Sequence, residues 1–253
     1  MRVLITRPRE QSASFSGELK AIGADPIYLP TIAIQPVEDK SRLDKSLTRL
    51  NDYAWLVLTS ANAAAVVLER LNTLKVGTLP KDLRVAAIGP KTGAKLKAAG
   101  ISPDYVPEQY IAEAIIPGLG DLRGRWVLLP MADIAHDTLP KAIQAADGIP
   151  HVITVYHTVL AEPDPNGLAA LRSGVDVITF TSGSTVRNFF TLCQNAGINP
   201  HNLPSDPTIA CIGPKTAQTA HDLGLRVDIV ADPHTTVGLA AKIKSLSDRT
   251  PIL

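Results

Sequence analysis

The chain has 253 residues, of which 45% are hydrophobic and 19% are charged. Because this length exceeds the size at which one hydrophobic core usually keeps growing, we expect two fully folded lobes rather than a disordered protein. The 25 basic and 24 acidic side chains leave a net charge of +1, which argues against a nucleic-acid-binding protein because such proteins carry a strong positive field.

The amino-terminal sequence and the cysteines bear on the cellular compartment. The apolar run at the start of the chain, within residues 1–5 (MRVLI), is too short for a signal peptide. No apolar run approaches the roughly 20 residues that a membrane-spanning helix needs. Cys193 and Cys211 lie in apolar contexts without metal-ligand spacing. We therefore expect a cytoplasmic protein with no membrane contact.

Short apolar runs of strand length alternate with amphipathic stretches of helical period along the whole chain. This alternation is typical of a parallel sheet with helices on both faces, so the predicted fold class is α/β. The predicted strands lie near 2–5, 27–30, 55–59, 84–88, 104–106, 126–129, 151–156, 176–181, 208–212 and 227–230. The predicted helices lie near 9–22, 40–50, 62–73, 91–99, 111–116, 135–146, 166–173, 184–195, 215–222 and 236–246.

Two extended stretches, Thr31 to Gln35 and Thr154 to Leu160, are bracketed or followed by prolines. Proline disfavours helix in the residue before it, so these stretches are interpreted as linkers rather than ordinary loops. They are the predicted crossings between the two lobes.

The two halves of the chain resemble each other. Residues 85–92 (VAAIGPKT) recur as residues 209–216 (IACIGPKT), an offset of 124 positions. Residues 55–62 likewise parallel residues 177–184 at an offset of 122. The chain is therefore interpreted as a duplicated unit, and the duplication alone suggests a division near Gly120.

Four turns between a predicted strand and the following helix are rich in Ser, Thr, Gly and Lys. Hydroxyl caps and free backbone N–H groups at a helix start can bind an anion, and parallel α/β sheets bind ligands at this edge. The same residue types are also what any helix start needs, so a purely structural role stays open. The candidate anion-binding residues are Thr59, Ser60, Ala61, Asn62, Gly89, Lys91, Thr92, Thr181, Ser182, Gly183, Ser184, Gly213, Lys215 and Thr216.

Three basic residues at this edge are further candidates. Lys91 and Lys215 lie in the first turn of predicted helices, where a cation is disfavoured unless an anion is bound nearby. Arg7 follows the first strand and can pair with a carboxylate through two parallel hydrogen bonds, or it can cap the sheet edge.

Tyr156 lies in the second linker, where its phenol could donate a proton to a ligand. The alternative is an aromatic side chain packed within the linker. The histidines have neither metal spacing nor a nucleophile partner, so we expect surface or packing roles for His136, His151, His157, His201, His221 and His234.

Nucleotide-binding motifs are absent from the sequence. Gly118, Gly120 and Gly124 miss the dinucleotide spacing and precede a strand, whereas that motif must follow one. Residues 89–95 lack the ending of a phosphate-binding loop, so we expect no cofactor and no metal. This disfavours a nucleotide-dependent transferase. A non-enzymatic, two-lobed small-molecule binding protein remains the alternative function, although the chain carries neither an export signal nor a DNA-binding unit.

Six motifs, taken in order, resemble the uroporphyrinogen-III synthase family over essentially the whole chain. They are LITRP at 4–8, LTSAN at 58–62, AIGPKT at 87–92, VYHT at 155–158, FTSGS at 180–184 and CIGPKT at 211–216. The chain departs from the family at Pro130 and Met131, where many members have Arg and Gly, and at His157, where many have Arg. Carboxylate contacts at these positions are therefore in doubt.

The resemblance implies two flavodoxin-like parallel-sheet lobes joined by a two-stranded linker, with the active site in the cleft between them. One lobe is discontinuous and comprises residues 1–35 and 160–253, whereas the other comprises residues 36–159. The linkers then lie near 31–36 and 154–160. This division replaces the one suggested by the duplication.

The resemblance also implies the reaction. The substrate is hydroxymethylbilane, a linear tetrapyrrole with eight carboxylates, which the enzyme closes to uroporphyrinogen III, inverting ring D through a spiro intermediate. This chemistry asks mainly for positioning. Tyr156 matches the family's linker tyrosine and is the candidate for assisting hydroxide departure. We expect a cofactor-free lyase of tetrapyrrole biosynthesis that is a monomer and makes transient contact with hydroxymethylbilane synthase.

Overall fold

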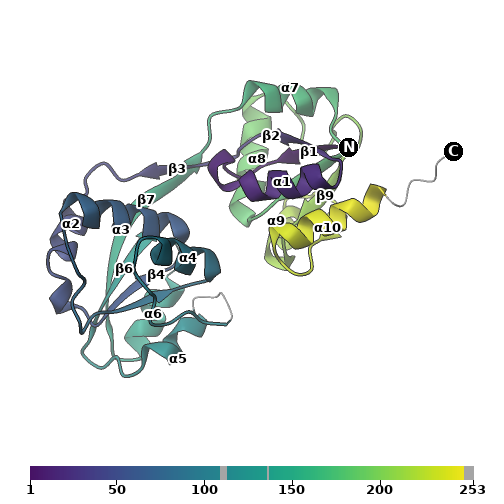
Figure 1. The fold of residues 1–253 in the computed structure, drawn as a ribbon. Helices are drawn as coiled ribbons and strands as arrows, with labels where there is room; N and C mark the ends of the chain where they lie inside the picture. Colours follow the sequence, from purple (N-terminus) through teal and green to yellow (C-terminus); the bar gives the residue numbers. More distant parts are fainter. Residues whose placement is uncertain (109–112, 136, 248–253) are drawn as a thin grey trace. The chain divides into compact units, whose positions relative to one another are not determined.

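A computed structural model of the chain describes residues 1–108, 113–135 and 137–247 (Figure 1). The chain divides into two compact units. Unit 1 comprises residues 1–33 together with the residues from 159 onward, and unit 2 comprises residues 34–158. Each unit contains a five-stranded sheet.

The sheet of unit 1 has the strand order of flavodoxin-like proteins. Its spatial order is β10-β9-β8-β1-β2, and each neighbouring pair is parallel. Counted along the chain, this order is 2-1-3-4-5 read from one edge. The strands are β1 (Arg2–Ile5), β2 (Asp25–Tyr28), β8 (Val177–Phe180), β9 (Thr208–Cys211) and β10 (Ile229–Val230).

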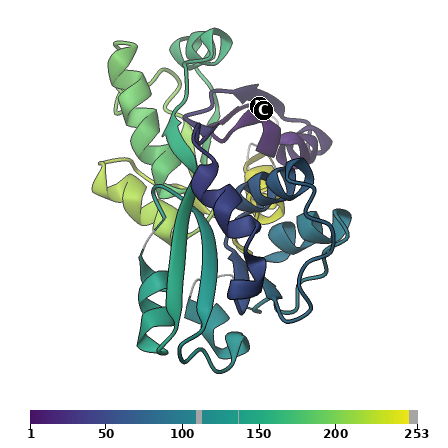
Figure 2. The ribbon, with the colours of Figure 1, turned by 90° about the vertical axis from the view of Figure 1, so that its left-hand side faces the viewer.

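The sheet of unit 2 has the spatial order β3-β7-β6-β4-β5. The pairs β7–β6, β6–β4 and β4–β5 are parallel, and Figure 2 shows β6 and β7 as long neighbouring strands. Tyr105 adds an isolated parallel bridge to Ala86 beyond β5. The strands are β3 (Ile32–Pro36), β4 (Trp55–Leu58), β5 (Arg84–Ala87), β6 (Trp126–Ala132) and β7 (Ile149–Leu160).

The first two strands of each sequence repeat lie in the same sheet as the later strands of the other repeat. In unit 1, β1 and β2 come from the first half of the chain, whereas β8, β9 and β10 come from the second half; unit 2 has the reverse combination. Equivalent hydrogen bonds follow the same offset of 124. The carboxylate of Asp104 accepts the N–H of Val85 at 2.7 Å, and the carboxylate of Asp228 accepts the N–H of Ile209 at 2.9 Å. One repeat therefore does not correspond to one unit.

Helices cover both faces of the unit 1 sheet. One buried cluster joins α1 and α10 to one face, and another joins α7, α8 and α9 to the other. These helices are α1 (Ala13–Ala21), α7 (Pro165–Ser173), α8 (Gly183–Asn195), α9 (Pro214–Asp222) and α10 (Thr236–Ser247).

In unit 2, as in unit 1, helices cover both faces of the sheet. One cluster joins α2, α3 and α4 to the sheet, and a second joins α5 and α6 to its other face. These helices are α2 (Ser41–Leu47), α3 (Ala61–Thr73), α4 (Pro90–Ala98), α5 (Ile116–Leu119) and α6 (Thr138–Ala145). Short 3-10 turns occur at Arg9–Gln11, Leu50–Asp52 and Glu113–Ile115. The predicted α/β class with parallel sheets is confirmed.

Several predicted elements differ in detail. The predicted strand at 104–106 is only the single bridge at Tyr105. The stretches predicted to form the two-stranded linker lie in β3 and the end of β7, which are neighbouring strands of one sheet. The predicted helix at 9–22 is divided at Ser12, where the 3-10 turn ends and α1 begins. The predicted helices at 111–116 and 135–146 lie partly outside the described residues.

Within the part of the chain that the structure describes, no helix combines the length and apolar character needed to span a membrane.

Candidate active site

The turn between β4 and α3 holds the first predicted anion site. Ser60 is the N-cap of α3, where its extended backbone lets the Oγ accept the N–H of Ala63 at 3.0 Å. Thr59, Ser60, Ala61 and Asn62 are all partly exposed. Since the first turn of a helix leaves N–H groups without intrahelical partners, this turn can present donors to an anion.

Tyr156 lies against this turn. Its phenol oxygen is 3.1 Å from Ser60 Oγ, and either hydroxyl can be the donor. The ring is buried with only 6% of the residue exposed, and it packs in the cluster that includes Leu58 and Val155. The predicted catalytic residue and a predicted binding residue are therefore in direct contact.

Asp133, just after β6, organises the end of β7 around Tyr156. Its carboxylate accepts the Thr158 N–H at 3.0 Å and lies 2.9 Å from His157 Nδ1. Its own N–H donates to the Tyr156 carbonyl at 3.1 Å. Burial raises the pKa of Asp133, but the hydrogen bonds from Thr158, His157 and Ile134 lower it more, so the net pKa lies below its ordinary value.

Sequence reasoning missed Asp133. An acidic residue directly after a buried parallel strand was the available signal, but only tertiary structure brings it beside residues 156–158. The other described histidines have packing roles or lie at the surface. His201, for example, packs edge-on against Phe190.

The turn between β8 and α8 is the counterpart in unit 1. Ser182 Oγ accepts the N–H of Thr185 at 3.2 Å, and Thr185 bonds back to the Ser182 backbone in a capping box. Ser184 Oγ lies 2.9 Å from Ser182 Oγ, and Thr181 is partly exposed. A Cβ atom at Gly183 would lie 2.7 Å from Thr219 Oγ1, so a side chain there would force the Thr219 hydroxyl to move.

Arg7 lies beside this turn. It follows β1, the sheet neighbour of β8, and Thr6 and Thr179 bind the two strands together through side-chain hydrogen bonds of 2.7 and 2.8 Å. The order 2-1-3-4-5 reverses direction between β1 and β8, and ligands of open α/β sheets bind at that crevice.

The Arg7 guanidinium has unused donor capacity. Its Nε is buried with no hydrogen-bond partner among the described residues, and Nη2 donates only a long bond of 3.4 Å to Gln11. Burial lowers the pKa of Arg7, against the opposing effect of Glu18. A carboxylate is the chemical complement of this group, and Glu18, whose charge acts on the Arg7 pKa, also has a buried Oε2 without a partner among the described residues. At the equivalent position of unit 2 stands Met131, which is buried and apolar, so this position offers no cation.

The two Gly-Pro-Lys-Thr turns differ in conformation despite their shared sequence. Gly89 has φ 88° and ψ 159°, whereas Gly213 has φ −174° and ψ 173°. Lys91 and Lys215 are exposed at the helix starts. Thr92 and Thr216 are only 3% and 5% exposed. Their burial disfavours the prediction that they bind an anion through their hydroxyls.

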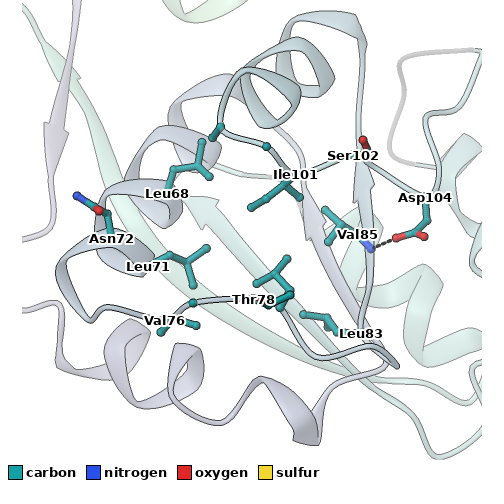
Figure 3. A pocket seen from close by; sticks show the side chains of 14 residues that line it. Leu68, Leu71, Asn72, Val76, Thr78, Leu83, Val85, Ile101, Ser102 and Asp104 are labelled. Carbon is teal, nitrogen blue, oxygen red and sulfur yellow. Dashed lines mark hydrogen bonds between the residues drawn. The ribbon is translucent and has the colours of Figure 1, made fainter.

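A cavity of about 710 Å³ lies at the opposite edge of the unit 2 sheet (Figure 3). Side chains of Leu68, Leu71, Leu83 and Ile101 line it, and its acidic residue Asp104 already accepts the Val85 N–H. This apolar lining does not suit a ligand with many carboxylates.

Among the residues that the structure describes, no cluster of three or more His, Cys, Asp or Glu side chains could hold a metal ion.

Comparisons with known proteins agree with this architecture. A sequence model of the family described as Uroporphyrinogen-III synthase HemD matches residues 13–241. The uroporphyrinogen-III synthase of Synechococcus elongatus is 32% identical over 253 residues, which cover 98% of this chain and 96% of the relative. The enzyme of Chlorobaculum parvum is 30% identical over 241 residues, covering 91% and 92% of the two chains.

Solved structures are similar over nearly the full length. A mutant uroporphyrinogen III synthase from Thermus thermophilus has a TM-score of 0.66 at 18% identity, covering 99% of this chain and 100% of the other. The Helicobacter pylori uroporphyrinogen-III synthetase has a TM-score of 0.65 at 18% identity, covering 98% and 100%. At such identities the structural similarity shows a shared fold.

Proposed function

Because the chain belongs to the uroporphyrinogen-III synthase family and is therefore a cyclising lyase of tetrapyrrole biosynthesis, we propose that it acts on its linear substrate through the residues described above. The substrate is hydroxymethylbilane, and the product, uroporphyrinogen III, has ring D inverted through a spiro intermediate. The observation that supports these binding residues is the buried Nε of Arg7, which lacks a hydrogen-bond partner among the described residues and follows β1, the sheet neighbour of β8.

Substrate carboxylates bind at the carboxyl edges of the two sheets. Arg7 pairs with one carboxylate, because its buried Nε lacks a partner and a carboxylate accepts two hydrogen bonds from a guanidinium. Backbone N–H groups in the turns after β4 and β8 hold others, while Lys91 and Lys215 contribute charge.

Tyr156 assists loss of the substrate hydroxyl. As the C–O bond breaks, its phenol gives a proton to the departing hydroxide, which leaves as water, while the pyrrole nitrogen supplies the electron pair that forms the azafulvenium cation. The substituted carbon of ring D attacks this cation to give the spiro intermediate. The bond from that carbon to the bridge of ring C then breaks, and the free α-carbon of ring D attacks the cation formed at this bridge, which closes the ring with ring D inverted. The proton that ring D loses when the ring is finally closed returns to the tyrosine oxygen. Ser60 supports the phenol through the 3.1 Å hydrogen bond.

The enzyme needs no cofactor or metal under this proposal, because positioning and one proton transfer supply the chemistry. Full turnover after dialysis against a chelator is the expected result. Activity that is lost on dialysis and restored by added metal would contradict it.

The protein acts as a cytoplasmic monomer and receives its unstable substrate through transient contact with hydroxymethylbilane synthase. Its two cysteines are free and buried, as suits a reducing compartment. Sedimentation alone and with that enzyme tests both association states, since a stable dimer would contradict the monomer.

One assay tests the reaction itself. Freshly generated hydroxymethylbilane is supplied to the protein, and the type I and type III products are separated after oxidation. We expect type III product in excess over the uncatalysed type I product. Type I product alone, from well-folded protein, would overturn the assignment.

A further inference from the structure

A second pocket lies at the amino edge of the unit 2 sheet. It has a volume of about 630 Å³, within the range of small-molecule sites. Trp126 begins β6, whereas Asp133 follows the end of the same strand, so the pocket and the Tyr156 site lie at opposite edges of the sheet. Its basic and aromatic lining residues are Arg42, Lys45, Arg49, Tyr53, Trp126 and His151.

Three aromatic rings form one wall of this pocket. Tyr53 Oη lies 2.7 Å from His151 Nδ1, and the two rings are stacked with 16° between their planes. The Trp126 ring meets His151 edge-on at 6.0 Å. Trp126 is 45% exposed, which leaves a large part of the indole open to a ligand.

The wall is electrically neutral near pH 7. Burial lowers the pKa of His151, and the nearby Arg42 lowers it further, which favours the neutral imidazole. The charge of the pocket therefore comes from its rim rather than from the rings.

The rim is cationic. Arg42 and Lys45 are exposed on α2, and neither forms an ion pair with any described residue. Arg49, just after α2, is neutralised by Asp52 at 2.6 Å. Two unpaired cations beside an open aromatic face are complementary to an anion that carries a flat ring.

We propose that this pocket binds a planar aromatic anion, whose ring stacks on Trp126 while its phosphate or carboxylate groups pair with Arg42 and Lys45. Trp126 and His151 lie near the amino ends of β6 and β7, whereas Arg42 also lines a neighbouring pocket that contains Asp133 and His157. A nucleotide and an aromatic carboxylate share this chemistry and must be distinguished by experiment.

The two tryptophans provide the measurement. Trp55 is buried and donates to the Leu119 carbonyl, whereas Trp126 is 45% exposed, so their two indole N–H signals in a nitrogen-15 NMR spectrum report on a covered and an open ring. Adenosine 5′-monophosphate and naphthalene-2,6-dicarboxylate are titrated separately into the full chain. We expect at least one of them to shift the Trp126 signal saturably and by more than the signal of the buried Trp55.

Variants then test the two parts of the site. Lys45→Ala and Trp126→Leu should each weaken binding of that probe by about tenfold or more, measured by calorimetry, because each removes one recognition element. Lys97→Ala is the matched control, since Lys97 is an exposed helix lysine of the same unit outside this pocket. It should bind like the wild type.

The two titrations distinguish a nucleotide site from a carboxylate site. Binding of the monophosphate alone identifies a nucleotide site, and binding of the dicarboxylate alone identifies a carboxylate site. No shift with either probe at millimolar concentration overturns the proposal. Equal binding of adenosine or inorganic phosphate also overturns it, as does full affinity in Lys45→Ala, because ring and charge would then not be recognised together.

Discussion

At the scale of single residues, the hydroxyl of Tyr156, which is hydrogen-bonded to Ser60, can have a chemical role or can belong to a ring that only packs. Removing this hydroxyl alone distinguishes the two roles. Tyr156→Phe keeps the buried ring and removes only the hydroxyl, so the fold should persist while turnover falls by about 10²-fold, as for loss of a general acid. The product should still be type III, because the substrate pose depends on the carboxylate contacts. Initial rates with fresh hydroxymethylbilane and product separation measure both.

Two outcomes would change this assignment. Full activity in Tyr156→Phe would return the residue to packing, whereas a switch to type I product would make it a positioning group. Tyr105→Phe is the control, because it also removes a phenol hydrogen bond in unit 2, to the Ala114 carbonyl, away from Ser60.

The two cysteines give a prediction that depends on pH. Burial raises the pKa of Cys193 and of Cys211 from 9.0 to about 12. At pH 9 only about 10⁻³ of each thiol is ionised in the folded protein, so a disulfide reagent such as DTNB should label neither until the chain unfolds. Prompt labelling of the native protein would show that these sites open.

The sign of the linked stability effect follows from the same shift. The folded pKa lies above the unfolded value, so the stabilisation is complete below pH 9 and is lost as pH rises toward about 12. The urea midpoint should therefore fall between pH 8.5 and pH 10.5 by more in the wild type than in Cys193→Ala, compared at each variant's own pH 8.5 value. Equal losses would contradict this contribution.

At the scale of elements, Asp133 is the residue that holds the end of β7. Asp133→Ala removes the acceptor for the Thr158 N–H and the partner of His157, so Tyr156 should lose its position and kcat should fall more than KM rises. Asp133→Asn keeps one acceptor oxygen and should recover part of the rate. Equal kcat in both variants and the wild type would leave Asp133 without a positioning role.

The two glycines before α4 and α9 form a matched pair. Gly89 occupies a φ of 88° with extended ψ, which essentially only glycine adopts, whereas Gly213 is fully extended. Gly89→Ala should therefore cost about 1–3 kcal/mol of unfolding free energy. Gly213→Ala should cost less, since its new Cβ would meet the His234 ring at an ordinary 3.4 Å. Urea unfolding of the two variants compares them, and equal costs would contradict the backbone argument.

Much of this element structure follows from local pattern. Apolar runs and amphipathic periods located most strands and helices, and Ser60 and Ser182 were identifiable as helix starts. The different conformations of Gly89 and Gly213 were not predictable, because their flanking sequences are the same. The Asp133 contacts and the Ser60–Tyr156 hydrogen bond depend on which strands are neighbours, which local pattern does not determine.

At the scale of the whole molecule, the exchanged strands decide which parts of the chain can fold alone. The sequence repeat suggests a division near Gly120, but a piece ending there lacks β6, which lies between β7 and β4 in the unit 2 sheet. Both buried clusters of unit 2, in contrast, are built only from residues within 34–158. The stable piece should follow the unit and not the repeat.

We therefore expect residues 31–160 to fold alone as a monomer, since this fragment contains the whole five-stranded sheet and the helices on both of its faces. Residues 1–124 should stay unfolded or aggregate, because they contain strands of two sheets and complete neither. Circular dichroism, cooperative urea unfolding and dispersed NMR spectra of the two fragments make the comparison. Cooperative folding of 1–124 alone, with 31–160 unfolded, would mean that each repeat is its own folding unit and that the strand exchange does not determine stability.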